Sequence, residues 1–288
     1  MSGAAVSGAA VSGAAPGAPG AADVDVLLPT RDRPEALAVT LAGLAGQSVT
    51  GFRVVLSDQS EQEPAARAPA VATMLRVLRQ RGCRVETGRH LPARGVAEHR
   101  AHLLSRATAP YVLALDDDVW LEPDALATLL AAMGELRCGF VGMSMLGLSY
   151  ADDVRPHEHA AYEEWAGPVR PERVRKDTPG WERWRLHNAA NLVHVAAGRG
   201  LRSGWTAYKV AWIAGCVLFD RAKLIDSGGF DFWAEIGDPR HAGEDVVAQL
   251  RVMERHGGAG LLPSRAYHLE LPTTVTDRRL DCYEAVLG

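Results

Sequence analysis

The sequence predicts a single α/β domain whose mainly parallel sheet is covered by helices on both faces. Short apolar runs alternate with segments of helical periodicity over residues 25–145. The run at 111–115 lacks the polar alternation of a half-exposed strand, which is typical of a strand buried on both faces. In such a fold, function is expected at the carboxyl ends of the strands, where Asp58 and three further aspartates fall.

Each strand in the first half is followed by a loop with turn residues and then by a helix. Pro34 suits the first position of a helix, and Leu37, Leu41 and Leu44 follow it at helical spacing. The expected elements are strands at 25–30, 52–58, near 85, 111–115 and 140–145, with helices at 34–46, 71–78, 96–104 and 123–133.

The alternation stops at 148–210, a stretch rich in Trp, Arg, Glu, His and Pro, which we interpret as an insert or lid. Aromatic faces bind sugar rings, so this region is a candidate for acceptor recognition, although core packing explains most tryptophans. The expected elements after it are a strand at 212–219, a short helix around Leu224, a turn at 228–231, a helix at 244–256 and a strand at 261–268.

The first 22 residues repeat Ser-Gly-Ala-Ala-Val and continue in Ala, Gly and Pro without a charge. Such a segment cannot bury enough surface to offset its ordering entropy, so residues 1–22 are predicted to be a disordered tail. They also lack the basic start and the long apolar centre of a secretory signal.

Composition excludes several classes of protein. The chain of 288 residues has a formal net charge of −4 and scattered arginines, which argues against a nucleic-acid partner. No stretch approaches the roughly 18 apolar residues of a transmembrane helix. The four cysteines show no zinc-site spacing. We expect them to be reduced thiols in a cytoplasmic protein.

Three carboxylates, Asp116, Asp117 and Asp118, directly follow the apolar strand at 111–115, with no basic residue beside them. Adjacent carboxylates repel each other unless a cation is bound, and their oxygens suit Mn²⁺ or Mg²⁺. A metal held there would bridge a diphosphate and neutralise charge on a leaving group. The structural alternative is a solvated acidic turn that caps the next helix, but the buried strand in front favours the metal site.

Several motifs, taken in order, resemble the inverting glycosyltransferases of family 2 from about Asp25 to Glu270. The resemblance implies the GT-A fold, a Rossmann-like sheet, and transfer of a sugar from a nucleotide-diphosphate donor. The matching motifs are Pro29-Thr30, Asp58, Asp116 to Asp118, Gly228-Gly229-Phe230-Asp231, and Gly243-Glu244-Asp245 at the start of a helix that reaches Arg251.

The resemblance also implies roles for single residues. Asp118 is expected to bind the metal directly, with Asp116 at the ribose or a metal-bound water, and His268 as a further ligand or a structural histidine. Asp58 is expected to contact the nucleobase, unless it only caps a helix. Gln59 departs from the family pattern, which leaves the base open between uracil and guanine. A UDP- or GDP-sugar is expected as the donor more than a dTDP-sugar. The expected donor-binding residues are Pro29, Thr30, Arg31, Arg33, Asp58, Arg94, Asp116 and Asp117.

Asp245 is expected to be the catalytic base, with Glu244 as the rival candidate. Backbone N–H groups at the helix start favour an ionised carboxylate there, although both acids would also serve as simple helix caps. In this scheme residues 23–147 form the nucleotide-sugar-binding half of the domain. Residues 211–288 form the acceptor-side half.

Two other functions compete with this one. Phosphohydrolases with an aspartyl nucleophile also carry an apolar strand followed by Asp-any-Asp, as in Asp116 to Asp118, but that strand normally comes first in their chains. A non-catalytic nucleotide-sugar-binding module is the second alternative. The intact carboxylate cluster and the pair Glu244-Asp245 argue against it.

Overall fold

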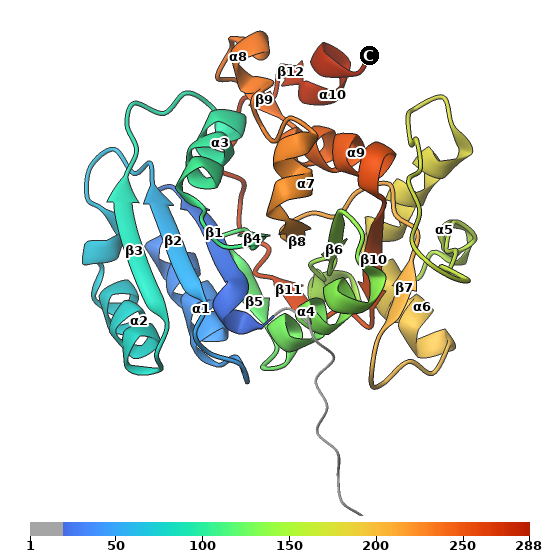
Figure 1. Cartoon of the computed structure of the whole chain (residues 1–288), viewed down its shortest axis with the longest axis horizontal. Helices are drawn as coiled ribbons and strands as arrows, with labels where there is room; N and C mark the ends of the chain where they lie inside the picture. Colours follow the sequence, from blue (N-terminus) through green and yellow to red (C-terminus); the bar gives the residue numbers. More distant parts are fainter. Residues whose placement is uncertain (1–19) are drawn as a thin grey trace, which may run out of the picture.

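The computed structural model describes residues 20–288 and confirms the α/β fold. A central sheet is flanked by helices, as Figure 1 shows. The strands are β1 (Val24–Thr30), β2 (Arg53–Asp58), β3 (Arg84–Arg89), β4 (Tyr111–Leu115), β5 (Val119–Leu121), β6 (Phe140–Gly142), β7 (Thr206–Tyr208), β8 (Cys216–Asp220), β9 (His241–Ala242), β10 (Gly258–Leu262), β11 (Ala266–His268) and β12 (Leu280–Asp281). The α-helices are α1 (Pro34–Ala45), α2 (Pro69–Gln80), α3 (Val96–Arg106), α4 (Ala125–Leu136), α5 (Pro156–His159), α6 (Asn191–Gly198), α7 (Arg221–Asp226), α8 (Trp233–Ile236), α9 (Glu244–His256) and α10 (Cys282–Val286).

The main sheet has eight strands in the order β3-β2-β1-β4-β8-β6-β10-β7. Four of its seven pairings are parallel, and those of β8 with β4 and β6 and of β7 with β10 are antiparallel. The first four strands in this order are therefore all parallel. Their carboxyl ends meet at one edge, where loops carry the polar residues of the site.

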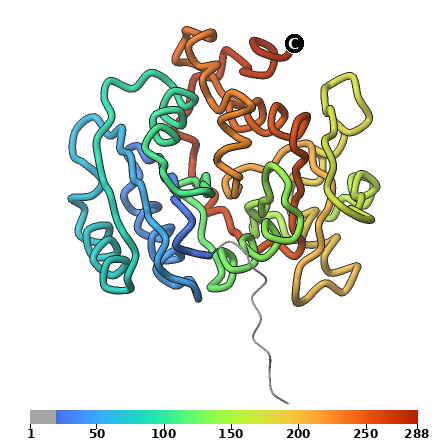
Figure 2. Tube along the Cα trace, in the orientation of Figure 1, coloured from blue at the N-terminus to red at the C-terminus, as the bar shows by residue number. Residues whose placement is uncertain are grey.

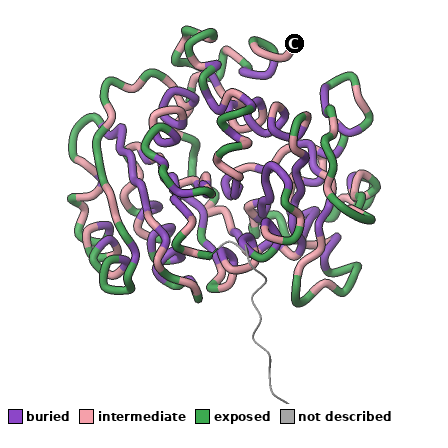
Figure 3. The backbone as a smooth tube through the Cα atoms, viewed as in Figure 1, coloured by how far each residue is buried: buried purple, intermediate pink, exposed green. Residues whose placement is uncertain are grey.

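The sheet separates two hydrophobic cores because successive side chains of a strand point to opposite faces. In β1, Val26 and Leu28 pack into the core that contains α1, α2 and α4. Leu27 packs into the other core, with residues of α3 and α9. Buried backbone follows the sheet and the inner faces of these helices, as Figure 3 shows. Burial on both faces is why the strands read as continuous apolar runs.

Two predicted strands differ from the structure. The strand expected at 261–268 is divided into β10 and β11 on either side of Pro263, which has no N–H to donate to a strand partner. The strand expected at 212–219 begins only at Cys216, since Gly215 has a φ of +76°. Before it, the backbone of Ile213 bonds to the side chain of Gln249 instead of to a strand.

The region predicted as an insert or lid packs onto the second half of the chain. Its last element, β7, is the edge strand of the main sheet next to β10. Trp181 packs in a tilted arrangement against Trp212 and against Tyr283 of α10, with ring centroids 5.0 Å apart in each case. Figure 2 shows this region in yellow-green to yellow at one end of the molecule. Its aromatic residues thus pack against other parts of the fold.

Other expectations concern the chain termini, the cysteines and membranes. Residues 1–19 of the predicted tail lie outside the described residues, and Ala21 and Ala22 belong to a short 3₁₀ helix, Ala21–Asp23. All four cysteines are buried and unpaired. In the part of the chain that the structure describes, no helix is long and apolar enough to cross a membrane.

Candidate active site

A cleft with a volume of about 1210 Å³ opens at the carboxyl ends of β1, β2 and β4. It is large enough for a nucleotide sugar, since ligand pockets commonly measure about 300–1,000 Å³. Helices α3 and α9 contribute their first turns to its walls. The polar lining residues include Thr30, Arg31, Arg33, Gln59, His99, Arg100, Asp116, Asp117, Asp118, Glu244, Asp245 and His268, with most of the segment 271–278.

The three aspartates after β4 have different surroundings. Asp117 is 3% exposed, and it accepts a hydrogen bond of 2.6 Å from the Thr30 hydroxyl. Burial raises the pKa of Asp117 to about 6, despite the opposing effects of Arg33 and Thr30. Burial alone would also raise the pKa of Asp118, but hydrogen bonds from His268 and Arg33 outweigh it and leave that pKa lowered. Asp118 therefore favours the ionised form.

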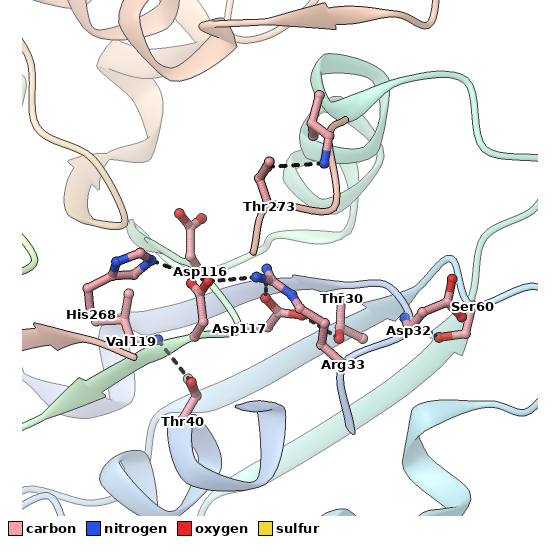
Figure 4. Close-up of polar contacts among 12 residues, drawn as sticks. Thr30, Asp32, Arg33, Thr40, Ser60, Asp116, Asp117, Val119, His268 and Thr273 are labelled. Atoms are coloured by element: carbon pink, nitrogen blue, oxygen red, sulfur yellow. Dashed lines mark hydrogen bonds and ion pairs between the residues drawn. The ribbon is translucent and has the colours of Figure 1, made fainter. Parts of the chain in front are cut away.

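Arg33 supplies positive charge to this cluster. Its guanidinium donates a hydrogen bond of 2.6 Å from Nη1 to Oδ2 of Asp118, and its Nη2 forms an ion pair with Asp117. Figure 4 shows Arg33 and His268 on opposite sides of the aspartates. No basic residue stands beside the carboxylates in the sequence, but the pairing of β1 with β4 places the Arg33 loop at the end of β4.

Arg100 links the aspartate cluster to the acidic pair on α9. Its Nη2 lies 2.6 Å from Asp116 Oδ1, and its Nε lies 2.7 Å from Glu244 Oε1. Arg100 is 9% exposed and Glu244 is 5% exposed. Glu244 therefore belongs to a buried ion pair, and its carboxylate is not free to accept a proton.

Asp245 is the half-buried carboxylate that faces the cleft beside Glu244. In residues 20–288, no basic side chain forms an ion pair with it, and its Oδ1 accepts a hydrogen bond of 2.9 Å from the N–H of Val246. Burial, and then the neighbouring Glu244 carboxylate, raises the pKa of Asp245 well above its ordinary value. The helix start favours the ionised form of Asp245, while its burial and Glu244 act in the opposite direction.

The segment before α9 is attached to α3 through His241. Its Nε2 accepts a hydrogen bond of 3.1 Å from Ala97 N–H, and its ring lies against Gly95. A Cβ on Gly95 would lie 2.2 Å from the His241 ring, and Gly95 has a φ of +101°. Only glycine suits this position. The start of α3, which carries Arg100, is therefore fixed next to the strand that precedes Asp245.

One pair of side chains fits a divalent metal. Oδ2 of Asp118 lies 3.3 Å from Nε2 of His268, and the hydrogen bond between them raises the pKa of His268. A carboxylate oxygen and an imidazole nitrogen are both metal donors, and magnesium-type sites commonly complete their shell with phosphate oxygens and water. Among the described residues no three His, Cys, Asp or Glu side chains form a metal site on their own. Asp116, also expected as a possible ligand, forms an ion pair with Arg100.

Two predicted donor-binding residues are not in the cleft wall. Asp58 is 3% exposed, and its carboxylate accepts bonds of 2.7 and 2.6 Å from the N–H groups of Ser60 and Ala65. These contacts fit the capping alternative, and the lining residue at this strand end is Gln59. Arg94 is exposed outside the lining, so Arg100 is the arginine of this region that faces the cleft. Pro29, Thr30, Arg31 and Arg33 all line it.

Sequence reasoning missed Arg100, His99 and the segment 271–278. His99 is buried and bonds to the Ser57 hydroxyl at 2.8 Å, and burial lowers its pKa to about 3, so it is neutral. Arg100 had a signal in the sequence. It lies between Ala97 and Leu104 on the buried face of α3, at helical spacing, where a charged residue needs partners. The segment 271–278 carried no such signal.

Known proteins resemble this chain in sequence and in fold. A family model described as "Glycosyl transferase family 2" matches residues 25–194. Curated proteins gave no match. Similar solved structures include S. aureus TarS 1–349 in complex with UDP-GlcNAc, with a TM-score of 0.52, 16% identity, and coverage of 87% of this chain and 59% of that chain. Another structure of S. aureus TarS has a TM-score of 0.51 and 16% identity, and covers 85% of this chain and 36% of that one. The chain thus spans less than two thirds of either TarS chain, and at 16% identity the likeness shows the fold alone.

Proposed function

The chain belongs to glycosyl transferase family 2, and from this premise we propose that it is a metal-dependent inverting enzyme that transfers a sugar from a nucleotide-diphosphate donor. The family match confirms the resemblance in the sequence and the class of enzyme that it implies. It also leaves the phosphohydrolase alternative without support. The donor, the metal and the stereochemistry are parts of the proposal that need experiments.

The observation that carries the proposal is the arrangement of two acidic groups in one cleft. Asp116, Asp117 and Asp118 end β4, and Asp245 opens α9 on the acceptor-side half. Arg100 connects the two groups by pairing with Asp116 and Glu244. A nucleotide sugar held at the first group would place its anomeric carbon between the diphosphate and the second group.

Asp118 and His268 would hold the metal, and the bound ion would stabilise negative charge on the leaving diphosphate. Thr30 and Arg33 hold Asp117 and Asp118 in position on the side of the cluster away from His268. Arg100 holds Asp116. These contacts keep the donor side of the cleft in one geometry before the substrate arrives.

Asp245 would accept the proton of an acceptor hydroxyl. As the proton moves to the carboxylate, the acceptor oxygen bonds to the anomeric carbon, and the bond from that carbon to the diphosphate oxygen breaks. Attack comes from the face opposite the leaving group, so a single displacement inverts the anomeric centre. Glu244 does not compete for the proton because Arg100 holds it in a buried ion pair.

A thermal-shift screen with UDP-, GDP- and dTDP-sugars tests the donor class. We expect a UDP- or GDP-sugar to raise the melting temperature in the presence of Mn²⁺, and EDTA to remove most of the increase. Ligand at about a hundred times its Kd stabilises the folded state by about 2.7 kcal/mol. UDP-GlcNAc, the compound in complex with S. aureus TarS 1–349, is a reasonable first choice. If every nucleotide sugar leaves the melting temperature unchanged with Mn²⁺ present, the proposed donor class is wrong.

The pH profile of kcat tests the base. A general base works only when ionised, and the pKa of Asp245 is raised by burial and by Glu244. Turnover should therefore be full above this raised pKa. It should decline as the pH falls through it, well above the value near 3.9 of an ordinary aspartate. An activity that stays constant down to about pH 4 would argue against Asp245 as the base.

A further inference from the structure

We propose that Arg33 is a built-in counter-cation for Asp118, which it releases when a divalent metal ion and the nucleotide bind together. The inference rests on the proposed function, because the metal is the one that accompanies the donor. Its consequence is that the free protein binds Mn²⁺ weakly, and that metal and nucleotide bind cooperatively.

The contacts of Arg33 overlap the metal position. Asp118 Oδ2 is 2.6 Å from Arg33 Nη1 and 3.3 Å from His268 Nε2. Asp118 and His268 would hold the metal, so the ion and Arg33 would use the same carboxylate. Two positive charges in contact with one carboxylate repel each other strongly where water is largely excluded, and the side chain of Asp118 is only 7% exposed. The ion and the guanidinium therefore compete for this carboxylate.

The charge balance explains why the free protein needs Arg33. Asp117 and Asp118 are adjacent and nearly buried, and unpaired buried carboxylates are costly. Arg33 contacts both with the two ends of its guanidinium fork. Arg33 thus neutralises the two carboxylates in the way that a bound metal ion would. The hydrogen bond from Thr30 holds Asp117 in place, so Arg33 keeps one carboxylate partner even after Asp118 is released.

Arg33 also retains an unused donor. Its Nε is buried without a hydrogen-bond partner in the described part of the chain. Buried N–H groups of charged side chains are normally bonded, so this residue of the cleft lining has a donor still to be satisfied. A phosphate oxygen is the acceptor that a guanidinium binds best after a carboxylate. Release of Asp118 would leave Arg33 next to the diphosphate with two of its nitrogen donors free.

The test is a titration of Mn²⁺ alone, without nucleotide, by calorimetry or by the loss of the free-ion electron paramagnetic resonance signal. Arg33→Gln should bind Mn²⁺ about tenfold more tightly than the wild type, a typical coupling between linked sites. Arg31→Gln is the matched control. Arg31 lies in the same loop but pairs with the exposed Glu61, so its loss removes one charge without freeing Asp118. Its effect on Mn²⁺ affinity should be much smaller.

A second measurement covers the case in which Arg33→Gln is less stable. Mn²⁺ should raise the melting temperature of this variant by more than it raises that of the wild type, and Arg33→Lys, which keeps one charge without the fork, should fall between them. Equal or smaller responses in Arg33→Gln would overturn the inference.

The experiments distinguish failure of the counter-cation role from failure of the proposed function. If Arg33→Gln gains Mn²⁺ affinity but no nucleotide sugar binds to any variant, the counter-cation role stands and the donor proposal fails. If the wild type binds a donor with Mn²⁺ and Arg33→Gln gains no Mn²⁺ affinity, only the counter-cation role fails.

Discussion

Replacement of Asp245 by asparagine should lower kcat by about a hundredfold or more, the scale expected when a general base is lost. The side chain keeps its size, and its oxygen still accepts the hydrogen bond from Val246 N–H, so folding should be preserved. Donor affinity should also be unchanged, because the base acts on the acceptor. Steady-state kinetics with the identified donor, together with donor titration by calorimetry, measures both quantities.

Glu244→Gln is the comparison variant. It removes the charge that pairs with Arg100, so its main expected effects are on stability and on the position of Arg100. If Asp245→Asn turns over normally and Glu244→Gln does not, the base has been assigned to the wrong carboxylate. If neither substitution changes kcat, the single-displacement mechanism proposed here is wrong.

Asp118→Ala should abolish metal-dependent donor binding while the protein stays folded. Loss of a residue that merely supports a metal ligand weakens metal affinity by about 10–100-fold, so loss of the ligand itself should exceed this range. Arg33 keeps its contact with Asp117 in this variant, which limits the destabilisation. Calorimetric titration of the donor with Mn²⁺ and with EDTA should give nearly the same weak affinity.

Asp124→Ala is the matched control for this loss. Asp124 lies at the start of α4, close in sequence to Asp118, but its carboxylate is half-exposed and pairs with Arg265. It should bind the donor and Mn²⁺ as the wild type does. If Asp118→Ala retains metal-dependent donor binding, the metal does not use this carboxylate.

Most of the first half of the fold could be predicted because local signals there agree with the tertiary structure. Pro34 begins α1 as expected, and the strand at 111–115 has the predicted bounds. The second half was harder because its strands are short or rich in glycine. In β10, a Cβ on Gly260 would lie 2.3 Å from the Tyr208 ring. Glycine is therefore required by packing against β7, which is next to β10 in the sheet but far from it in the sequence. No local pattern in the sequence reveals such a requirement.

The residues of the site that stand at strand ends and helix starts could be predicted from the sequence. The contacts between residues far apart in the sequence could not. The aspartates after β4 and the acids at the start of α9 were found because strand ends and helix starts are visible in the sequence. The sequence did not show which basic residues form ion pairs with these acids. Arg33 is 85 residues from Asp118, and Arg100 is 144 residues from Glu244, so only the parallel sheet and the packing of α3 bring them together.

The segment 271–278 lines the cleft without belonging to either acidic group. It runs from β11 to β12, and β12 pairs with β9, which lies just before α9 and Asp245. In Figure 1 it is the red stretch of chain that passes the middle of the molecule beside α3. Its residues are partly or fully exposed and lie outside both hydrophobic cores. One wall of the cleft is therefore formed by a segment that contributes nothing to either hydrophobic core. We expect that replacing residues 271–278 changes which molecules the cleft binds, while Asp118 and Asp245, which lie on other elements, keep their places.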